Sequence, residues 1–255
     1  MQIKITFLGT GTSHGIPVIG STHPVCLSTD IRDKRLRVSI LVEWDNFTYV
    51  VDCGPDFRQQ MLRANVSKIN GVLFTHIHAD HTAGLDDLRP FSAQIGAVPI
   101  YAKKDVLANL AKRFDYIFND ENKYLGAPSV QQNEITNEPF FIQNLKVIPI
   151  EVSHGDLQIF GFRFHNIAYL TDVKAIAAEE KLKLQNLDVL IINALRIQTH
   201  PTHLNLAEAI ALGQDLKAKR TYITHISNRL GLHAEVEKTL PNNVFLAYDE
   251  LVVEV

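Results

Sequence analysis

One short segment restricts the possible folds of this chain more than any other part of it. Residues 75–81 read THIHADH, and the six residues 76–81 hold four side chains able to bind a metal ion: His76, His78, Asp80 and His81. The apolar run before them predicts a strand that ends at His76. In an extended segment His76 and His78 share one face and could bind one ion, and Asp80 and His81 could reach a second. The alternative is a His-rich surface loop without metal.

Three more predicted strands end at a single metal-binding side chain. His154 follows strand 145–152, Asp172 follows strand 168–171, and His225 follows strand 222–224. A catalytic zinc ion usually keeps three protein ligands and one open position, so two ions need more donors than residues 76–81 supply. Each residue alone would more often form a turn. Together they are what a metal site on one rim of a β-sandwich requires.

The rest of the chain predicts strands and helices without a domain boundary. Expected strands include 3–7, 38–44, 47–51, 158–164 and 188–192, and expected helices include 56–64, 104–114 and one opened by Asn205 with Glu208 as a capping box. The polar, turn-rich residues 115–137 predict a surface loop that could act as a lid. We therefore expect one α/β domain over residues 1–255, with two face-to-face mixed sheets flanked by helices.

The composition excludes several classes of protein. The net charge of −3 provides no basic surface of the kind that nucleic-acid-binding proteins show. No apolar stretch approaches the roughly 18 residues of a membrane span, and the N-terminus lacks an apolar signal core. The two cysteines, Cys26 and Cys53, cannot make a disulfide framework. We expect a soluble cytoplasmic protein without a membrane partner, and we do not expect nucleic acid as its partner.

These motifs, in this order and spacing, resemble the metallo-β-lactamase superfamily over nearly the whole chain. The resemblance implies its αββα four-layer sandwich and a centre of two divalent ions. It implies that the first ion is bound by His76, His78 and His154. It implies that the second is bound by Asp80, His81 and His225, with Asp172 bridging both. VDCG at 51–54 also matches, and there Asp52 would orient a ligating histidine, unless it only caps a turn.

A finer resemblance is to the phosphodiesterase branch of that superfamily. Residues 8–17, LGTGTSHGIP, look like the opening of PhnP-like cyclic-phosphate phosphodiesterases and of tRNA 3′-processing endonucleases. The branch carries a proton-transferring histidine that matches His203, whose alternative role is a solvated residue at a helix entrance. His200 is a weaker candidate for that role. The roles of His14 and His233 stay open between substrate contact and turn or helix entry.

The resemblance implies a dinuclear-metal-dependent hydrolase that cleaves a small phosphodiester or cyclic phosphate. A metal-bridging hydroxide would attack phosphorus, His203 would act as general acid, and Asp80 could orient the nucleophile besides binding metal. The His-rich ligands favour zinc, and the carboxylate bridge also admits manganese or iron. The alternatives are a tRNA 3′-processing-type endonuclease, a thioester hydrolase, and a non-catalytic metal-binding protein of this fold.

Two departures from the branch bear on these alternatives. PhnP-like proteins bind an extra structural zinc through three cysteines and a histidine, and the matching positions here are Ser21, His23, Cys26 and Asn228. Only His23 and Cys26 are good ligands, so that ion stays an open question. The tRNA endonucleases carry a long arm for which the short segment from His154 to Asp172 has no room. The oligomeric state, a homodimer included, is also open.

Overall fold

The structure of the protein is a computed structural model that describes residues 1–119 and 121–255. The chain forms two compact units, each with its own sheet. The first unit comprises Met1–Gly9, Arg37–Thr136 and Val252–Glu254, and the second comprises Thr10–Leu36, Asn137–Leu251 and Val255. The expectation of a single domain over residues 1–255 stays a prediction.

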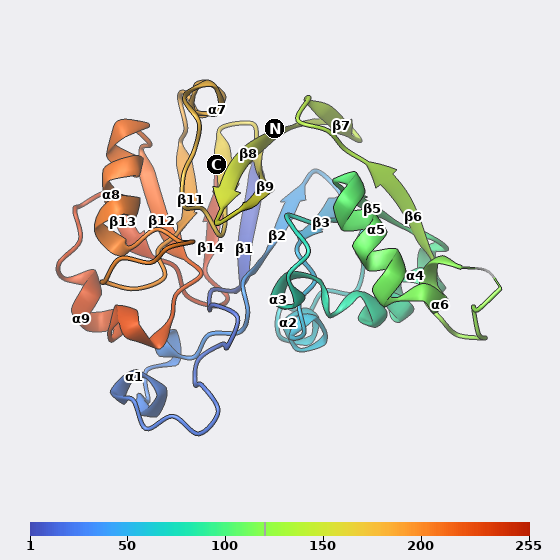
Figure 1. The fold of residues 1–255 in the computed structure, drawn as a ribbon, viewed down its shortest axis with the longest axis horizontal. Coiled ribbons are helices and arrows are strands. Elements are labelled where there is room, and N and C mark those ends of the chain that lie inside the picture. Colours follow the sequence, from blue (N-terminus) through green and yellow to red (C-terminus); the bar gives the residue numbers. More distant parts are fainter. Residues whose placement is uncertain (120) are drawn as a thin grey trace. The chain divides into compact units, whose positions relative to one another are not determined.

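A seven-stranded mixed sheet is the framework of the first unit (Figure 1). In spatial order its strands are β14 (Val252–Glu254), β1 (Ile3–Gly9), β2 (Ser39–Trp44), β3 (Phe47–Val51), β4 (Gly71–Leu73), β5 (Val98–Ala102) and β6 (Val130–Glu134). The pairs from β14 to β3 are antiparallel, and those from β3 to β6 are parallel. Because β3 and β4 run in the same direction, their C-terminal ends lie at the same edge of this sheet.

Helices connect the parallel strands of the first sheet, as parallel pairing requires. They are α2 (Phe57–Arg63), α3 (Ala79–Thr82), the 3₁₀ helix η2 (Leu85–Leu88), α4 (Arg89–Ile95), α5 (Lys104–Arg113) and α6 (Asp115–Phe118). Phe57 of α2, Phe91 of α4 and Leu110 of α5 are buried in one cluster with strand residues such as Val50 and Val72. This burial of apolar surface attaches the helices to the sheet.

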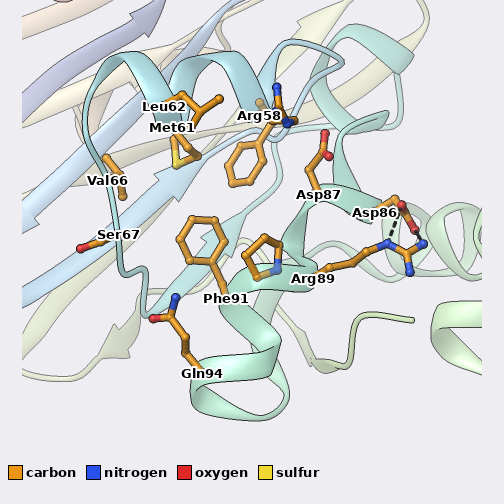
Figure 2. A pocket seen from close by; sticks show the side chains of 12 residues that line it. Arg58, Met61, Leu62, Val66, Ser67, Asp86, Asp87, Arg89, Phe91 and Gln94 are labelled. Carbon is orange, nitrogen blue, oxygen red and sulfur yellow. Dashed lines mark hydrogen bonds and ion pairs between the residues drawn. The ribbon is translucent and has the colours of Figure 1, made fainter. Parts of the chain in front are cut away.

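A mostly apolar pocket of about 510 Å³ opens beside α2 and α4 (Figure 2). Met61 and Phe91 line it, and the Asp86–Arg89 ion pair stands on its rim. It contains none of the side chains expected to bind metal. The pocket therefore offers apolar contact rather than the chemistry that the sequence predicts.

The second unit is built on another seven-stranded mixed sheet. In spatial order its strands are β13 (Val244–Leu246), β12 (Arg220–Thr224), β11 (Val189–Asn193), β10 (Ile167–Leu170), β9 (Leu157–Phe164), β8 (Leu145–His154) and β7 (Phe140–Ile142). The pairs from β7 to β10 are antiparallel, and those from β10 to β13 are parallel. Consequently β8, β10, β11 and β12 all point the same way, and the residues that follow them lie along one edge of this sheet.

The helices of the second unit pack on this sheet or cap its loops. They are α1 (Pro24–Leu27), η1 (Ile31–Asp33), α7 (Ala178–Leu182), α8 (Leu206–Asp215), η3 (Asn228–Leu230) and α9 (His233–Glu237). Asn205 and Glu208 form the expected capping box at the start of α8, with both reciprocal bonds at 2.8 Å. Leu206 and Ala209 of α8 are buried in one cluster with Leu190 and Ile223 of the sheet.

The expectation of a surface loop over residues 115–137 is wrong for two stretches of it. Asp115–Phe118 is helix α6, and Val130–Glu134 is strand β6, which pairs with β5 through five register partners. The polar sequence of β6 gives no period-two signal because an edge strand buries little of its surface. Residue 120, also in this segment, lies outside the described residues.

Among the described residues, no helix has the length and apolar character needed to traverse a bilayer.

Candidate metal centre

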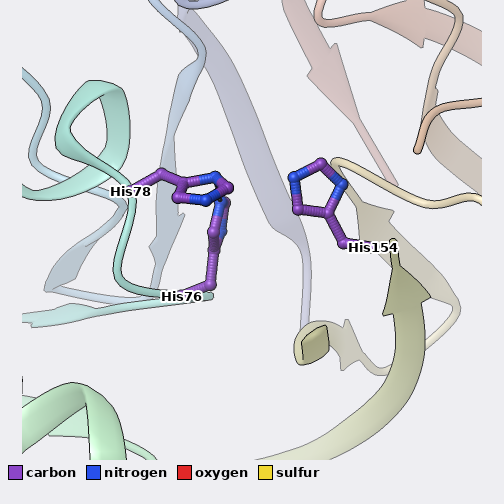
Figure 3. Close-up of side chains that lie close together, drawn as sticks. All are labelled: His76, His78 and His154. Atoms are coloured by element: carbon purple, nitrogen blue, oxygen red, sulfur yellow. Dashed lines mark hydrogen bonds between the residues drawn. The ribbon is translucent and has the colours of Figure 1, made fainter. Parts of the chain in front are cut away.

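Three histidines of the segment 75–81 gather at the C-terminal end of β4. The rings of His76 and His78 stand edge to face, with His76 Nε2 2.9 Å from His78 Nδ1 (Figure 3). The ring of His81 lies 4.2 Å from that of His76, centroid to centroid, and its Nε2 points at Asp80 Oδ2 at 3.4 Å. His76 and His81 are buried, whereas His78 is exposed. All four donors that the motif predicts thus lie together in the first unit.

Asp52, at the end of β3, fixes the orientation of two of these imidazoles. Its Oδ2 accepts the Nδ1–H of His81 at 2.6 Å, which directs Nε2 of His81 toward Asp80. Its Oδ1 accepts the backbone N–H of Thr75 at 2.9 Å, and the Thr75 hydroxyl lies 2.9 Å from Oδ2 and 3.0 Å from His76 Nδ1. The Thr75 hydroxyl can donate to Asp52 and accept the Nδ1–H of His76. With its proton on Nδ1, His76 has an unprotonated Nε2. Burial raises the pKa of Asp52, and the adjacent His81 opposes that shift.

Gly54 allows the loop that carries the candidate donors to lie against the residues that follow β3. A Cβ at this position would stand 2.0 Å from the carbonyl oxygen of Asp80. The neighbouring Cys53 donates its backbone N–H to the His81 carbonyl (2.8 Å) and accepts the Gly84 N–H (2.9 Å). Residues 51–54 therefore hold the segment that carries the donors in place through backbone contacts.

In the second unit, three imidazoles surround one carboxylate oxygen. Asp172 follows β10, and its Oδ1 lies 2.9 Å from His203 Nε2, 3.2 Å from His225 Nε2 and 4.0 Å from His154 Nε2. The Thr171 hydroxyl donates to Oδ2 at 2.6 Å. All three histidines come from the same edge of the sheet: His154 ends β8, His225 follows β12, and His203 precedes α8. The parallel strands explain why residues so distant in sequence meet here.

Thr202 orients two of these histidines. Its carbonyl oxygen accepts from His154 Nδ1 at 3.0 Å, so Nε2 of His154 turns toward Asp172. Its hydroxyl lies 2.9 Å from Nδ1 of His203, whose Nε2–H then donates to Asp172. Burial lowers the pKa of His203 to about 4, and the hydrogen bond with Asp172 opposes this effect.

Three residues around these donors have a left-handed backbone, which non-glycine residues rarely adopt. Asp52 has φ 66°, Asp172 has φ 58° and His225 has φ 53°. Asp52 and His225 directly follow β3 and β12, and Asp172 lies two residues beyond the end of β10. Residues kept in this region cluster at functional sites, where the surrounding structure compensates for the strain. Seven other described non-glycine residues also have a positive φ, so this conformation accompanies the donor pattern without being specific to it.

The donors of both units fit divalent metal ions. Within the second unit, His154, Asp172 and His203 offer ligand atoms that lie within 4.8 Å of one another. Within the first unit, the adjacent nitrogens of His76 and His78 could share one cation. Imidazole and carboxylate donors whose other atoms are held by hydrogen bonds are typical of transition-metal sites.

The other histidines singled out by the sequence occupy different surroundings. His14 and His200 line a cavity together with His203. His233 is buried elsewhere in the second unit, with its Nδ1 3.1 Å from Nη2 of Arg35. His23 uses Nδ1 to accept the Val25 N–H at the start of α1, and Cys26 Sγ accepts the Val18 N–H. Among the described residues, His23 and Cys26 belong to none of the groups of three donors.

Several residues of the site escaped the sequence analysis. Thr75 and Thr202 act through hydrogen bonds to histidines, and each directly precedes a donor histidine in the sequence. Arg113 of α5 donates to the Ile77 carbonyl and the Thr82 hydroxyl, which holds the donor loop. Arg196 and Arg229, which line the cavity beside His203, lack any local motif.

The sequence is similar to that of a known protein family and of several curated proteins. A family model described as the β-lactamase superfamily domain matches residues 48–226. An octanoyltransferase of Porphyromonas gingivalis is 38% identical over 252 residues, which are 98% of this chain and 51% of that protein. A ribonuclease Z of an Exiguobacterium species is 28% identical over 167 residues, 63% of this chain and 48% of that protein. The chain spans about half the length of these two curated relatives.

Solved structures are similar to this protein over nearly the whole chain. A crystal structure described as a new diphosphatase from the PhnP family is 40% identical, with a TM-score of 0.93 over 99% of this chain and 98% of that chain. The short form of human tRNase Z shares the fold, with 19% identity and a TM-score of 0.72 over 98% of each chain. Together with the two mixed sheets flanked by helices, these similarities confirm the α/β fold class expected from the sequence.

Proposed function

This chain belongs to the metallo-β-lactamase superfamily of hydrolases, and we propose that it is a metal-dependent phosphodiesterase that acts on a small phosphorylated molecule. The observation that carries the proposal is His203, whose Nε2 lies 2.9 Å from the carboxylate of Asp172 among the donor histidines. The ligand sets that the family resemblance implies do not include His203, so this histidine would be available to protonate a departing ester oxygen. The 40% identity with a PhnP-family diphosphatase supports phosphoester chemistry.

We assign the ligands as the family resemblance implies. One ion would be held by His76, His78 and His154, and the other by Asp80, His81 and His225, with Asp172 shared. When bound, two such ions supply a nucleophile at neutral pH and neutralise charge on the phosphoryl oxygens. The prevalence of imidazole favours zinc, and manganese or iron also suits the carboxylates.

The chain's own residues position the donors and handle the proton. Asp52 holds His81 in one tautomer, and through Thr75 it does the same for His76. His203 would carry the proton on Nε2 and release it to the oxygen that leaves phosphorus. Burial disfavours the charged ring and lowers the pKa of His203, so the ring is neutral near pH 7 and would act as general acid only after taking up a second proton. Asp80 would orient the nucleophile besides binding metal.

Hydrolysis of bis(p-nitrophenyl) phosphate by the metal-reconstituted protein tests this proposal. We expect hydrolysis by the wild type and a fall in kcat of about 10²- to 10⁴-fold for His203→Ala, the usual contribution of a general acid. Metal content should stay the same in the variant. His165→Ala is the matched control, since His165 lies in the turn between β9 and β10. Lack of diester hydrolysis with every divalent metal would exclude the proposal.

A second candidate is tRNA 3′-end processing, because several curated relatives are named ribonuclease Z. The local structure favours the first candidate. β8 and β9 are joined by Gly155 and Asp156 alone, and β9 and β10 by His165 and Asn166 alone. No arm therefore protrudes between His154 and Asp172, and the net charge of −3 does not favour polyanion binding. Cleavage of a precursor tRNA, assayed beside the small diester, separates the two.

A further inference from the structure

The first unit contains a pocket that the proposed metal chemistry does not use, the space of about 510 Å³ beside α2 and α4 (Figure 2). None of the described side chains proposed to bind metal lines it. Its volume is that of a small-molecule pocket. Its apolar lining residues are Phe57, Met61, Leu62, Val66, Pro90 and Phe91. The pocket therefore has the size and the lining to receive a small molecule with an apolar body.

Two aromatic rings shape the apolar part of this pocket. The rings of Phe57 and Phe91 stand edge to face, with their centroids 6.1 Å apart. Both side chains are buried, whereas Leu62, which also lines the pocket, is exposed. A ligand placed against these residues would remove apolar surface from water, and an aromatic ligand could add edge-to-face contacts with the two rings. These residues favour a ligand with an aromatic or large aliphatic group.

Four of the described residues that line the pocket are charged, and two of them already bind each other. Arg89 donates from Nε to Asp86 at 2.9 Å, and from Nη2 to the same carboxylate at 2.5 Å. Arg89 also donates to the Gly126 carbonyl and the Tyr124 hydroxyl, and the Tyr116 hydroxyl donates to Asp86 at 2.6 Å. This pair is therefore engaged within the protein and is not the part of the rim that would recruit a ligand.

The other two charged lining residues, Asp87 and Arg58, are unpaired. Neither side chain makes a hydrogen bond or an ion pair with any described residue. They lie on the same side of the pocket (Figure 2), and the positive charge of Arg58 reaches Asp87 without direct contact. Burial and the adjacent Asp86 raise the pKa of Asp87, and the charge of Arg58 opposes this rise. Both groups can therefore still form charge-assisted hydrogen bonds.

The two unpaired charges have opposite signs, which restricts the ligand. An ammonium group alone would meet the repulsion of Arg58, and a carboxylate alone would meet that of Asp87. A molecule that carries both groups on one carbon atom could bind both residues through charge-assisted hydrogen bonds. An α-amino acid is the simplest molecule with this arrangement, and its side chain would enter the apolar part of the pocket.

We propose that this pocket binds a free apolar α-amino acid. Asp87 accepts hydrogen bonds from the ammonium group, and Arg58 donates to the carboxylate. The side chain of the ligand packs against Phe57, Met61 and Phe91. No bond of the ligand is broken or formed, and the proposal does not depend on the proposed function.

Calorimetric titration of the metal-loaded protein with four small molecules tests the ligand class. L-Phenylalanine has both charges and an aromatic body, 2-phenylethylamine lacks the carboxylate, and 3-phenylpropanoate lacks the ammonium group. We expect L-phenylalanine to bind about 10-fold or more tightly than either, because only it uses both charged residues. Glycine has both charges without the apolar body and should bind about 10-fold or more weakly than L-phenylalanine. Glycine also controls for an amino acid that merely coordinates the metal.

Two conservative variants test the two charged residues separately. Asp87→Asn should weaken the binding of L-phenylalanine about 10-fold and that of 3-phenylpropanoate less than about 3-fold, since only the first has an ammonium group. Arg58→Gln should weaken the binding of L-phenylalanine by a similar factor without weakening that of 2-phenylethylamine. Asp105→Asn is the matched control, because Asp105 is exposed on α5 and does not line the pocket.

The outcomes do not depend on phosphodiester hydrolysis, so this proposal and the proposed function can fail separately. Failure of the wild type to bind L-phenylalanine, or equal binding of glycine and L-phenylalanine, would overturn the proposal. An affinity for L-phenylalanine that is unchanged in either Asp87→Asn or Arg58→Gln would overturn it as well. So would an equal loss for all ligands in a variant, since that result indicates a distorted pocket rather than a lost charge.

Discussion

Replacement of Asp52 by asparagine tests how a buried carboxylate controls His81, one of the proposed metal ligands. The Asp52 side chain is fully buried, accepts the Nδ1–H of His81 at 2.6 Å and accepts two donors of Thr75. In asparagine an NH₂ group replaces one carboxylate oxygen. In either orientation of the amide, this NH₂ group faces a donor of His81 or of Thr75. Asparagine tolerates the left-handed φ of 66° at this position, so the backbone adds little strain.

The expected effect falls mainly on metal affinity. Without its carboxylate partner, His81 can carry its proton on Nε2, the nitrogen that would bind metal. Loss of such an orienting partner typically costs 10–100-fold in metal affinity, or about 1.4–2.8 kcal/mol. The stability of the metal-free protein should fall by only about 1–2 kcal/mol, because removal of a buried charge offsets part of the lost hydrogen bond.

Competition with a chromogenic chelator measures zinc affinity, and urea unfolding in excess chelator measures stability. Asp56→Asn is the matched control, because Asp56 pairs with Arg37 and binds no histidine. A zinc affinity of Asp52→Asn within about twofold of the wild type, in a folded protein, would refute the reasoning.

Three further predictions follow from single contacts. Gly54→Ala should lower the free energy of unfolding by more than about 2 kcal/mol, measured by urea denaturation, since its Cβ would lie 2.0 Å from the Asp80 carbonyl; an unchanged midpoint would contradict this. Asn205→Ala should cost about 1 kcal/mol through loss of the capping box, seen as a lower Tm. Burial and the adjacent Arg35 lower the pKa of His233 to about 4, so the unfolded chain binds this proton more readily. The free energy of unfolding should keep this contribution in full above pH 6.5 and fall by up to about 3 kcal/mol as the pH drops to 4. His233→Gln should reduce this dependence on pH. An unchanged dependence in the variant would contradict the assignment to His233.

Local patterns in the sequence predicted the strand ends and most of the elements that carry donors. The apolar run 71–75 led to β4 and its histidines, and Asn205 with Glu208 led to the start of α8. These features are local, since strand alternation and capping depend on residues a few positions apart. The identity of the ligands and their two-ion assignment came from resemblance to a family and stay predictions.

Features that depend on sheet topology could not be predicted. Arg196 and Arg229 share one cavity because β11 and β12 are parallel neighbours whose following loops meet at one edge. Nothing near either residue in the sequence indicates this. Strand β6 was missed for a related reason: its pairing with β5 forms it, and its polar side chains give no alternation.

Titration of the chelator-treated protein with zinc, monitored by diester hydrolysis, tests the central claim most directly. We predict no measurable hydrolysis without metal, a rate that rises until about two ions per chain are bound, and no further rise beyond that. Full activity in excess chelator, or a rate that saturates at one ion per chain, would contradict a dinuclear metal-dependent hydrolase.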